Sequence, residues 1–135
     1  MIQITLMEAY LIETLRHKGL TNDTILKHVH EKRVDELQKY HDSFDFTGLY
    51  ALEDHLATIL QEGYQIKFLT MPGLINLLRM KYNKELEKDY IAKETSLENL
   101  TLTTEEKSDL ENWLAANWQL VENEEKFSIV PRHSH

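Results

Sequence analysis

Residues 64–84, YQIKFLTMPGLINLLRMKYNK, contain the two kinds of local signal from which the fold of this chain can be read. The run 64–69 is rich in residues that favour extended backbone, and it predicts a short strand. Pro72 suits the first turn of a helix, where its missing N–H is not needed. Apolar residues three and four apart follow it, so we expect a helix over 72–83. The residues expected in the core on this helix are Leu74, Leu77, Leu78 and Tyr82.

Four further helices are expected from the same periodicity and from residues that suit helix ends. Their approximate ranges are 4–18, 24–41, 49–62 and 103–121. Gly19 and Gly63 follow two of these helices and suit the left-handed residue that often ends a helix. Thr103 and Glu106 have the spacing of a capping box at the start of the last one.

Four segments leave the choice of structure open. Residues 2–6 alternate apolar and polar side chains as a strand does, although we prefer a helix there. Residues 85–92 suit a continued helix, and residues 97–102 suit either a strand or an irregular connection. Residues 127–130, just before a proline, suit a short strand.

These signals together predict one mostly α-helical domain of about five helices over residues 1–130. They leave room for a two- or three-stranded β element made from residues 64–69, 97–102 and 127–130. Residues 131–135 are expected to be a flexible tail. A chain of 135 residues is an ordinary size for one domain. Its four glycines and two prolines are too few for the frequent turns of an all-β protein.

Composition narrows the classes of function. The chain has no cysteine, which excludes disulfides, thiol nucleophiles and cysteine-bound zinc. Its first residues lack the basic region of a signal peptide, and no apolar run approaches the ~20 residues that span a bilayer. We therefore expect a cytoplasmic protein that does not bind a membrane.

Charge is distributed unevenly along the chain. Residues 1–84 contain 10 Lys and Arg against 11 Asp and Glu, whereas residues 85–125 contain 3 against 12. An acidic surface can attract a basic partner, although it can also serve only to keep a protein soluble. We expect a regulatory or inhibitory module that binds another protein, itself basic, through an acidic C-terminal face. The residues of this acidic set are Glu105, Glu106, Asp109, Glu111, Glu122, Glu124 and Glu125.

The alternative is a DNA-binding regulator that resembles a helix-turn-helix protein and places the helix at 72–83 in a groove. Asn and Arg side chains read base edges, and Lys side chains contact phosphates. The residues of this basic set are Lys67, Asn76, Arg79, Lys81, Asn83 and Lys84. Against this reading, the connector over 63–70 is longer than the three or four residues of the usual turn. The neighbouring acidic segment would also repel the duplex.

Signals of catalysis or metal binding are weak. Glu13 and His17 share a helical face, but none of the seven histidines belongs to a His-x-x-x-His or Glu-x-x-His pattern. No serine lies in a nucleophile-elbow sequence, and no glycine-rich phosphate loop is present. We therefore predict a protein that is not an enzyme, with no catalytic residue, no cofactor and no metal site.

Overall fold

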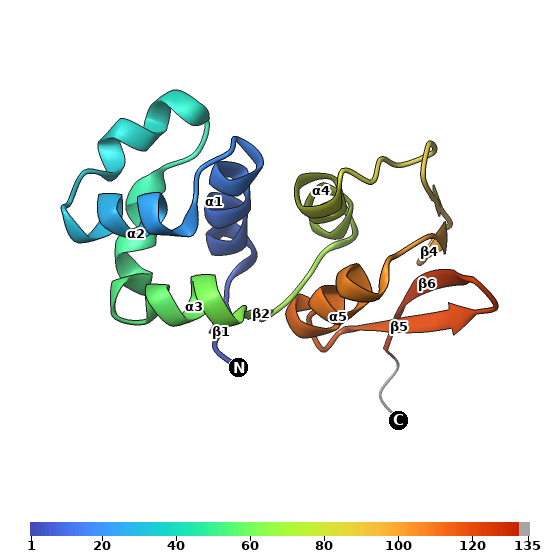
Figure 1. Cartoon of the computed structure of the whole chain (residues 1–135). Coiled ribbons are helices and arrows are strands. Elements are labelled where there is room, and N and C mark those ends of the chain that lie inside the picture. Colours follow the sequence, from blue (N-terminus) through green and yellow to red (C-terminus); the bar gives the residue numbers. More distant parts are fainter. Residues whose placement is uncertain (133–135) are drawn as a thin grey trace.

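The computed structural model describes residues 1–132, and two lobes that meet at a short parallel ladder can be followed in Figure 1. In this ladder β1 (Gln3–Ile4) pairs with β2 (Gln65–Ile66). Residues 1–63, which we call the N-terminal lobe, are helical apart from β1. Residues 64–132, the C-terminal lobe, contain β2, two helices and a four-stranded sheet. The whole is an α+β domain in which helix predominates, as the sequence predicts.

Helix α1 (Leu6–His17) is central to the N-terminal lobe and contacts both of its 3-10 helices. A capping box fixes its start, because the Thr5 N–H donates to the Glu8 carboxylate at 2.8 Å and the Glu8 N–H donates to the Thr5 hydroxyl at 3.1 Å. The other helices of this lobe are α2 (Asn22–His30), the 3-10 helices η1 (Val34–Tyr40) and η2 (Phe46–His55), and α3 (Leu56–Glu62).

The single helix expected over 24–41 is wrong, because the chain turns between α2 and η1. Lys32 has a φ of 58°, in the left-handed region, and the Arg33 N–H donates to the His28 carbonyl at 2.8 Å. A helix continued from the buried Val29 would carry Lys32 and Arg33 towards the core. The turn keeps both side chains in solvent.

The helix expected over 49–62 is also two helices, η2 and α3. The buried residues of η2 are Phe46, Leu49 and Leu52, which are three apart and so share one face of a 3-10 helix. Those of α3 are Leu56, Ile59 and Leu60, which have α-helical spacing. The change in spacing of the apolar residues therefore matches the change in helix type.

The C-terminal lobe begins with α4 (Met71–Tyr82), close to the predicted helix over 72–83. The Thr70 hydroxyl caps its start by accepting the Gly73 N–H at 3.1 Å, and Asn83 ends it in the left-handed region. Leu74, Leu77 and Leu78 are buried as predicted, whereas Tyr82 is only partly buried. The expected core residues of α4 are thus confirmed with one adjustment.

The helix expected over 103–121 is wrong in its second half. Its capping box at Thr103 and Glu106 is confirmed, but α5 (Thr104–Trp113) ends early, and the strand β5 (Trp118–Asn123) follows. The run Trp-Gln-Leu-Val-Glu fits both helical and strand periods over so short a stretch. Pairing with β6 (Lys126–Pro131) decides for the strand.

The four-stranded sheet is antiparallel in the order β3–β4–β6–β5, with β3 (Ile91–Ala92) and β4 (Leu97–Leu100) completing it. The predicted strands at 97–102 and 127–130 are therefore neighbours. The segment 64–69 does not join them, because β2 pairs with β1 instead. Residues 85–90 form a turn with a bridge between Leu86 and Tyr90, not a continued helix. Of the predicted tail, residue 131 ends β6 and residues 133–135 lie outside the described part of the chain.

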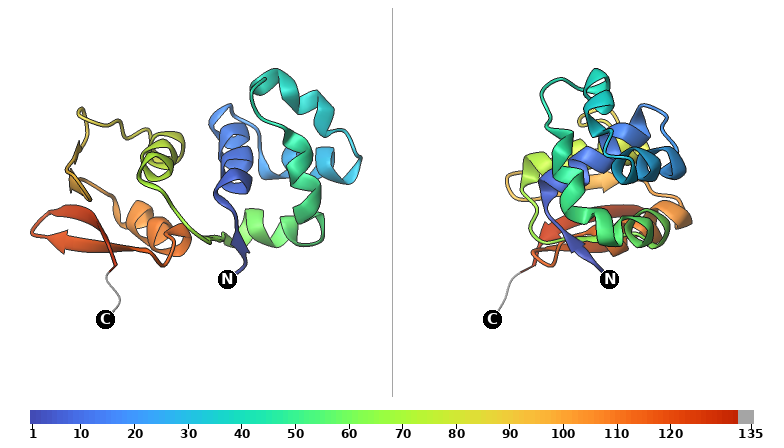
Figure 2. Two further views of the ribbon diagram at one scale, coloured as in Figure 1. Left: turned by 180° about the vertical axis from the view of Figure 1, so that it is seen from behind. Right: turned by 90° about the vertical axis from the view of Figure 1, so that its left-hand side faces the viewer.

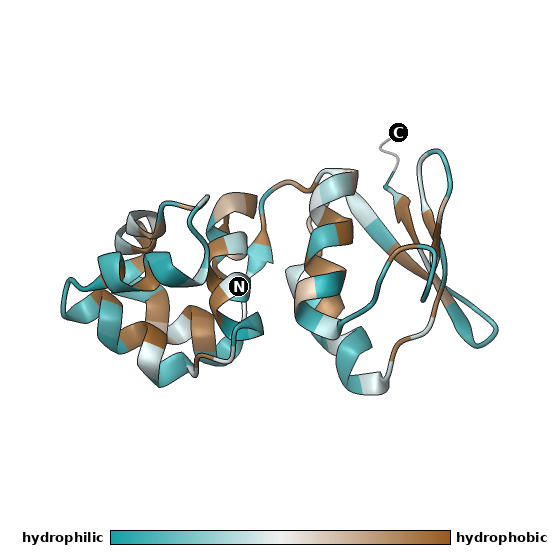
Figure 3. Ribbon diagram, turned by 90° about the horizontal axis from the view of Figure 1, so that it is seen from above, coloured by the Kyte–Doolittle hydropathy of each residue, from teal (hydrophilic) through white to brown (hydrophobic). Residues whose placement is uncertain are grey.

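One core joins the two lobes, with α1 of the first packed against α4 of the second. The left view of Figure 2 shows the four-stranded sheet extending away from the N-terminal helices, with α5 below α4. In Figure 3 the helices turn apolar residues towards the interior of each lobe and polar residues outwards. Among the described residues no helix is long and apolar enough to cross a bilayer.

Candidate functional site

Helix α5 carries four residues of the acidic set, and they fall into two pairs. Glu105 and Glu111 are exposed, and neither makes an ion pair or a side-chain hydrogen bond within residues 1–132. Glu106 instead closes the capping box, where its carboxylate accepts the Thr103 N–H at 3.0 Å. Asp109 is half exposed, and its carboxylate pairs with Lys81, whose side chain is only 8% exposed. Only the first pair therefore has carboxylates that make no hydrogen bond or ion pair within residues 1–132.

Asp109 links α5 to α4. The Tyr82 hydroxyl donates to its Oδ2 at 2.5 Å, and the Lys81 Nζ lies 3.4 Å from the same oxygen. The Trp113 Nε1–H in turn donates to the Tyr82 oxygen at 2.9 Å. Burial raises the pKa of Tyr82 well above its ordinary value, and the hydrogen bond to Asp109 adds to this. Tyr82 is therefore a fixed donor that positions α5.

The turn between β5 and β6 carries the other three acidic residues. Glu122 lies near the end of β5, and Glu124 and Glu125 form the turn, all with exposed side chains. A shallow hollow beside the turn is lined by Glu98 of β4 as well as by Glu122 and Glu124. Lys126 is the one cationic residue among the described residues that line it. Folding thus adds a fourth carboxylate to this end of the sheet.

Glu98 was missing from the sequence prediction. It is half-buried on β4 and accepts a hydrogen bond from the Ser128 hydroxyl at 3.2 Å. Its place in the acidic segment 85–125 was the only available signal, since the pairing of β4 with β6 is a long-range contact.

Within residues 1–132, the backbone of β5 is open along one side, because this strand ends the sheet and β6 alone pairs with it. The Arg132 N–H donates to the Asn117 carbonyl at 3.0 Å, just before β5 begins. In an antiparallel pair every second residue of a strand is hydrogen-bonded to its partner strand, so this bond shows which residues of β5 are bonded to β6. By that alternation Leu120 and Glu122 direct their N–H and C=O groups away from β6. A groove of about 360 Å³ lies beside this edge, and its charged residues are Glu111 and Arg132.

The basic set does not gather on one surface. Lys67, Arg79 and Asn83 are exposed, but the Asn76 amide donates to the Tyr10 hydroxyl at 3.1 Å. Lys81 is buried, and Lys84 is half-buried. The main partner of α4 is α1, whereas α3 packs against α2 and η2. A helix-turn-helix motif would pair α4 with α3, the helix before the connector over 63–70, but the main contacts of these two helices are with other elements.

Lys81 belongs to a buried cluster around Glu13, whose side chain is only 4% exposed. Glu13 Oε2 accepts hydrogen bonds from the Tyr64 hydroxyl at 2.6 Å, from Arg16 at 3.0 Å and from Lys81 at 3.2 Å. Burial and the charge of Glu13 raise the pKa of Tyr64 well above its ordinary value. The cluster links α1, the residue before β2 and α4, so we assign it a structural role.

Comparison with models of protein families, with curated proteins and with solved structures found no match. Within residues 1–132, no three acidic or histidine side chains lie close enough together to hold a metal ion. The exposed acidic residues beside the open edge of β5 are therefore the candidate functional site.

Proposed function

We propose that this protein is a cytoplasmic regulatory or inhibitory module that binds a basic partner protein through the acidic C-terminal face. The observation that carries the proposal is the open edge of β5, which lies between Glu111 on one side and the acidic turn on the other. The partner adds an extended, lysine- or arginine-rich segment to β5. No chemical reaction is part of this proposal.

The charge of this edge supports a basic partner over a second copy of the chain. An exposed edge strand is a template for pairing with any other strand, and proteins commonly protect such edges with charge. Here Glu122 and Glu124 would repel the same residues of a second copy. They would attract the lysine or arginine side chains of a basic strand.

A capture experiment with two matched variants tests the proposal. The first variant carries Glu111→Gln, Glu122→Gln and Glu124→Gln, and the second removes three exposed carboxylates from the N-terminal lobe by Asp35→Asn, Asp54→Asn and Glu62→Gln. The two variants have the same net charge, so a nonspecific ionic effect is equal in both. Each immobilised protein is incubated with lysate in 0.15 M salt, and retained proteins are identified by mass spectrometry.

We expect a basic protein that the unchanged chain and the N-terminal variant both retain, and that the C-terminal variant loses. Retention of the same proteins by all three chains would contradict the proposal, as would equal losses from both variants. A purified partner should then bind the C-terminal variant at least tenfold more weakly than the N-terminal one.

DNA binding by α4, the alternative, has less support, since Asn76 and Lys81 make contacts inside the protein. A duplex titration across salt concentration tests it, because binding to phosphates weakens steeply as salt rises. Loss of binding on Arg79→Ala, with steep salt dependence, would favour this alternative over protein binding.

A further inference from the structure

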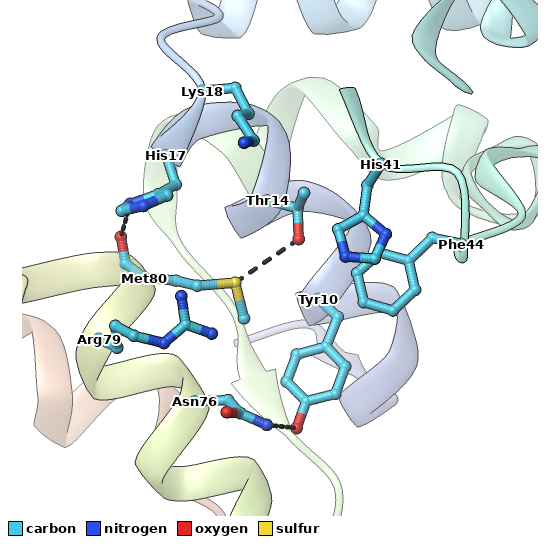
Figure 4. Close-up of a pocket in the computed structure, with 9 residues that line it drawn as sticks. All are labelled: Tyr10, Thr14, His17, Lys18, His41, Phe44, Asn76, Arg79 and Met80. Carbon is cyan, nitrogen blue, oxygen red and sulfur yellow. Dashed lines mark hydrogen bonds between the residues drawn. The ribbon is translucent and has the colours of Figure 1, made fainter. Parts of the chain in front are cut away.

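A cavity of about 350 Å³ lies between α1 and α4, at the junction of the two lobes, and Figure 4 shows the side chains around it. Among the described residues that line it, four are basic and none is an aspartate or glutamate. His17 and Lys18 come from the end of α1, His41 follows η1, and Arg79 comes from α4. Side chains from three parts of the chain thus converge on one hollow.

The cationic side chains of the cavity are available to a ligand. Arg16 and Arg33 form ion pairs with carboxylates, whereas Arg79 and Lys18 form none with residues 1–132. Glu85 lines an adjoining hollow that Arg79 also lines, and its carboxylate pairs with Lys88 at 3.6 Å. The field inside the cavity therefore favours an anion.

One wall of the cavity is aromatic. The rings of His41 and Phe44 stack with centroids 4.1 Å apart and 12° between their planes. Tyr10 stacks on Phe44 with centroids 6.0 Å apart and 15° between planes. The three rings thus form a nearly parallel series that a flat group can extend by stacking.

Hydrogen bonds hold the walls in place and leave one polar atom without a partner. The His17 Nδ1–H donates to the Met80 carbonyl at 3.2 Å, and the Asn76 amide holds the Tyr10 hydroxyl. The Nδ1 of His41 is enclosed but has no hydrogen-bond partner within the described chain. A buried polar atom without a partner is costly, so this part of the cavity wall is not optimised for stability alone.

We propose that this cavity binds a mononucleotide, with its phosphate on Arg79 and Lys18 and its base against the aromatic wall. Guanidinium and ammonium groups are the usual partners of phosphate, and aromatic rings stack on any base. The volume falls within the range of small-molecule sites. This site is separate from the acidic face, and the failure of either proposal leaves the other intact.

Isothermal titration with five kinds of ligand tests the chemistry. The probes are the four common ribonucleoside 5′-monophosphates, adenosine, ribose 5-phosphate, inorganic phosphate and a single-stranded hexanucleotide, all in 0.1 M salt. We expect at least one monophosphate to bind five times more tightly than ribose 5-phosphate, adenosine or inorganic phosphate. The stacked base and the phosphate then both contribute.

Each other result overturns the proposal. If no monophosphate binds, the proposed site is wrong. If adenosine binds as tightly as its monophosphate, the phosphate does not contribute to binding. If inorganic phosphate binds as tightly as the monophosphates, the base does not contribute. Tighter binding of the hexanucleotide than of any monophosphate would replace the proposed site with a single-stranded nucleic-acid site.

Variants at exposed positions then locate the ligand. Arg79→Gln should weaken binding at least tenfold, and Arg79→Lys should restore part of the loss because it keeps the charge. Lys27→Gln removes an exposed lysine of α2 that does not line the cavity, and it should leave affinity unchanged. Thermal melting of each variant without ligand shows that it folds. Equal affinities of Arg79→Gln and Lys27→Gln would contradict the proposed site.

Discussion

In the N-terminal lobe the Lys32 Nζ lies 2.6 Å from a Glu53 oxygen, and Arg33 pairs with both Glu31 and Glu36. On the β5–β6 turn, by contrast, Glu122 and Glu124 form no ion pair within residues 1–132. Charges that neutralise one another leave little field at a distance, whereas unpaired charges of one sign add. The comparison teaches that net charge along a sequence is a weaker guide to a binding face than the pairing of those charges.

The largest change in stability is expected on removal of a carboxylate that is paired inside the protein. Glu13→Ala leaves the buried Lys81 without its closest partner, and we expect it to lower the free energy of unfolding by about 3 kcal/mol. Urea unfolding followed by circular dichroism measures the loss. Glu111→Ala, which removes an unpaired surface carboxylate, should change stability by about 0.5 kcal/mol or less. Equal losses for the two variants would mean that pairing does not matter at position 13.

A smaller effect is expected where α5 joins α4. Tyr82→Phe removes the hydroxyl that donates to Asp109 and accepts from Trp113, so the indole N–H loses its partner. We expect a loss of about 1–2 kcal/mol in urea unfolding. Tyr40→Phe removes a partly buried tyrosine hydroxyl that makes no side-chain hydrogen bond in the described chain, and it serves as the control. Equal losses would show that the bonds of Tyr82 add nothing.

At the acidic turn, we expect stability to depend more on the backbone conformation of Glu124 than on its charge. Glu124 has a φ of 58°, which a glycine adopts without strain. Glu124→Gly should therefore raise the free energy of unfolding by about 0.5–1 kcal/mol, while Glu124→Gln, which removes only charge, should have a smaller effect. Thermal and urea unfolding compare the two. A larger gain from the glutamine variant would make charge repulsion the main strain at this turn.

The smallest expected effect is a pH dependence of the paired surface in the N-terminal lobe. The hydrogen bond and charge of Lys32 lower the pKa of Glu53, so this pair contributes stability above the ordinary glutamate pKa and loses it as pH falls. Unfolding midpoints of the unchanged chain and of Glu53→Gln should differ at pH 6. The difference should shrink as pH falls towards 3. A difference that is constant with pH would show that ionisation of Glu53 has no part in it.

Local signals predicted much of the fold, and the misses have physical causes. The end of α1 before Gly19 and the start of α4 at Pro72 follow from signals that act within one turn. The helix preferred over residues 2–6 is wrong at its start, because Gln3 and Ile4 form β1 by pairing with the distant β2. The breaks at Lys32 and between η2 and α3 depend on which residues the rest of the protein buries. The strand β5 is settled by its pairing with β6, which is a tertiary contact.

The candidate site was predicted less completely. Glu105, Glu111 and the three residues of the turn are exposed as the sequence suggests, but Asp109 is held by Tyr82 and Lys81. Periodicity shows one apolar face of α4, whereas α4 is also covered where Asn76 and Lys81 meet α1. Polar residues on such a second covered face cannot be told from solvent-exposed ones by pattern alone.

The pairing of β1 with β2 has a consequence for synthesis of the chain. Residue 4 cannot take its place until residue 66 has left the ribosome, because the two lie side by side in the ladder. Every helix of the N-terminal lobe is complete in sequence by then. We expect this lobe to assemble while the remaining half of the protein is still being translated, with β2 as the last piece that it awaits.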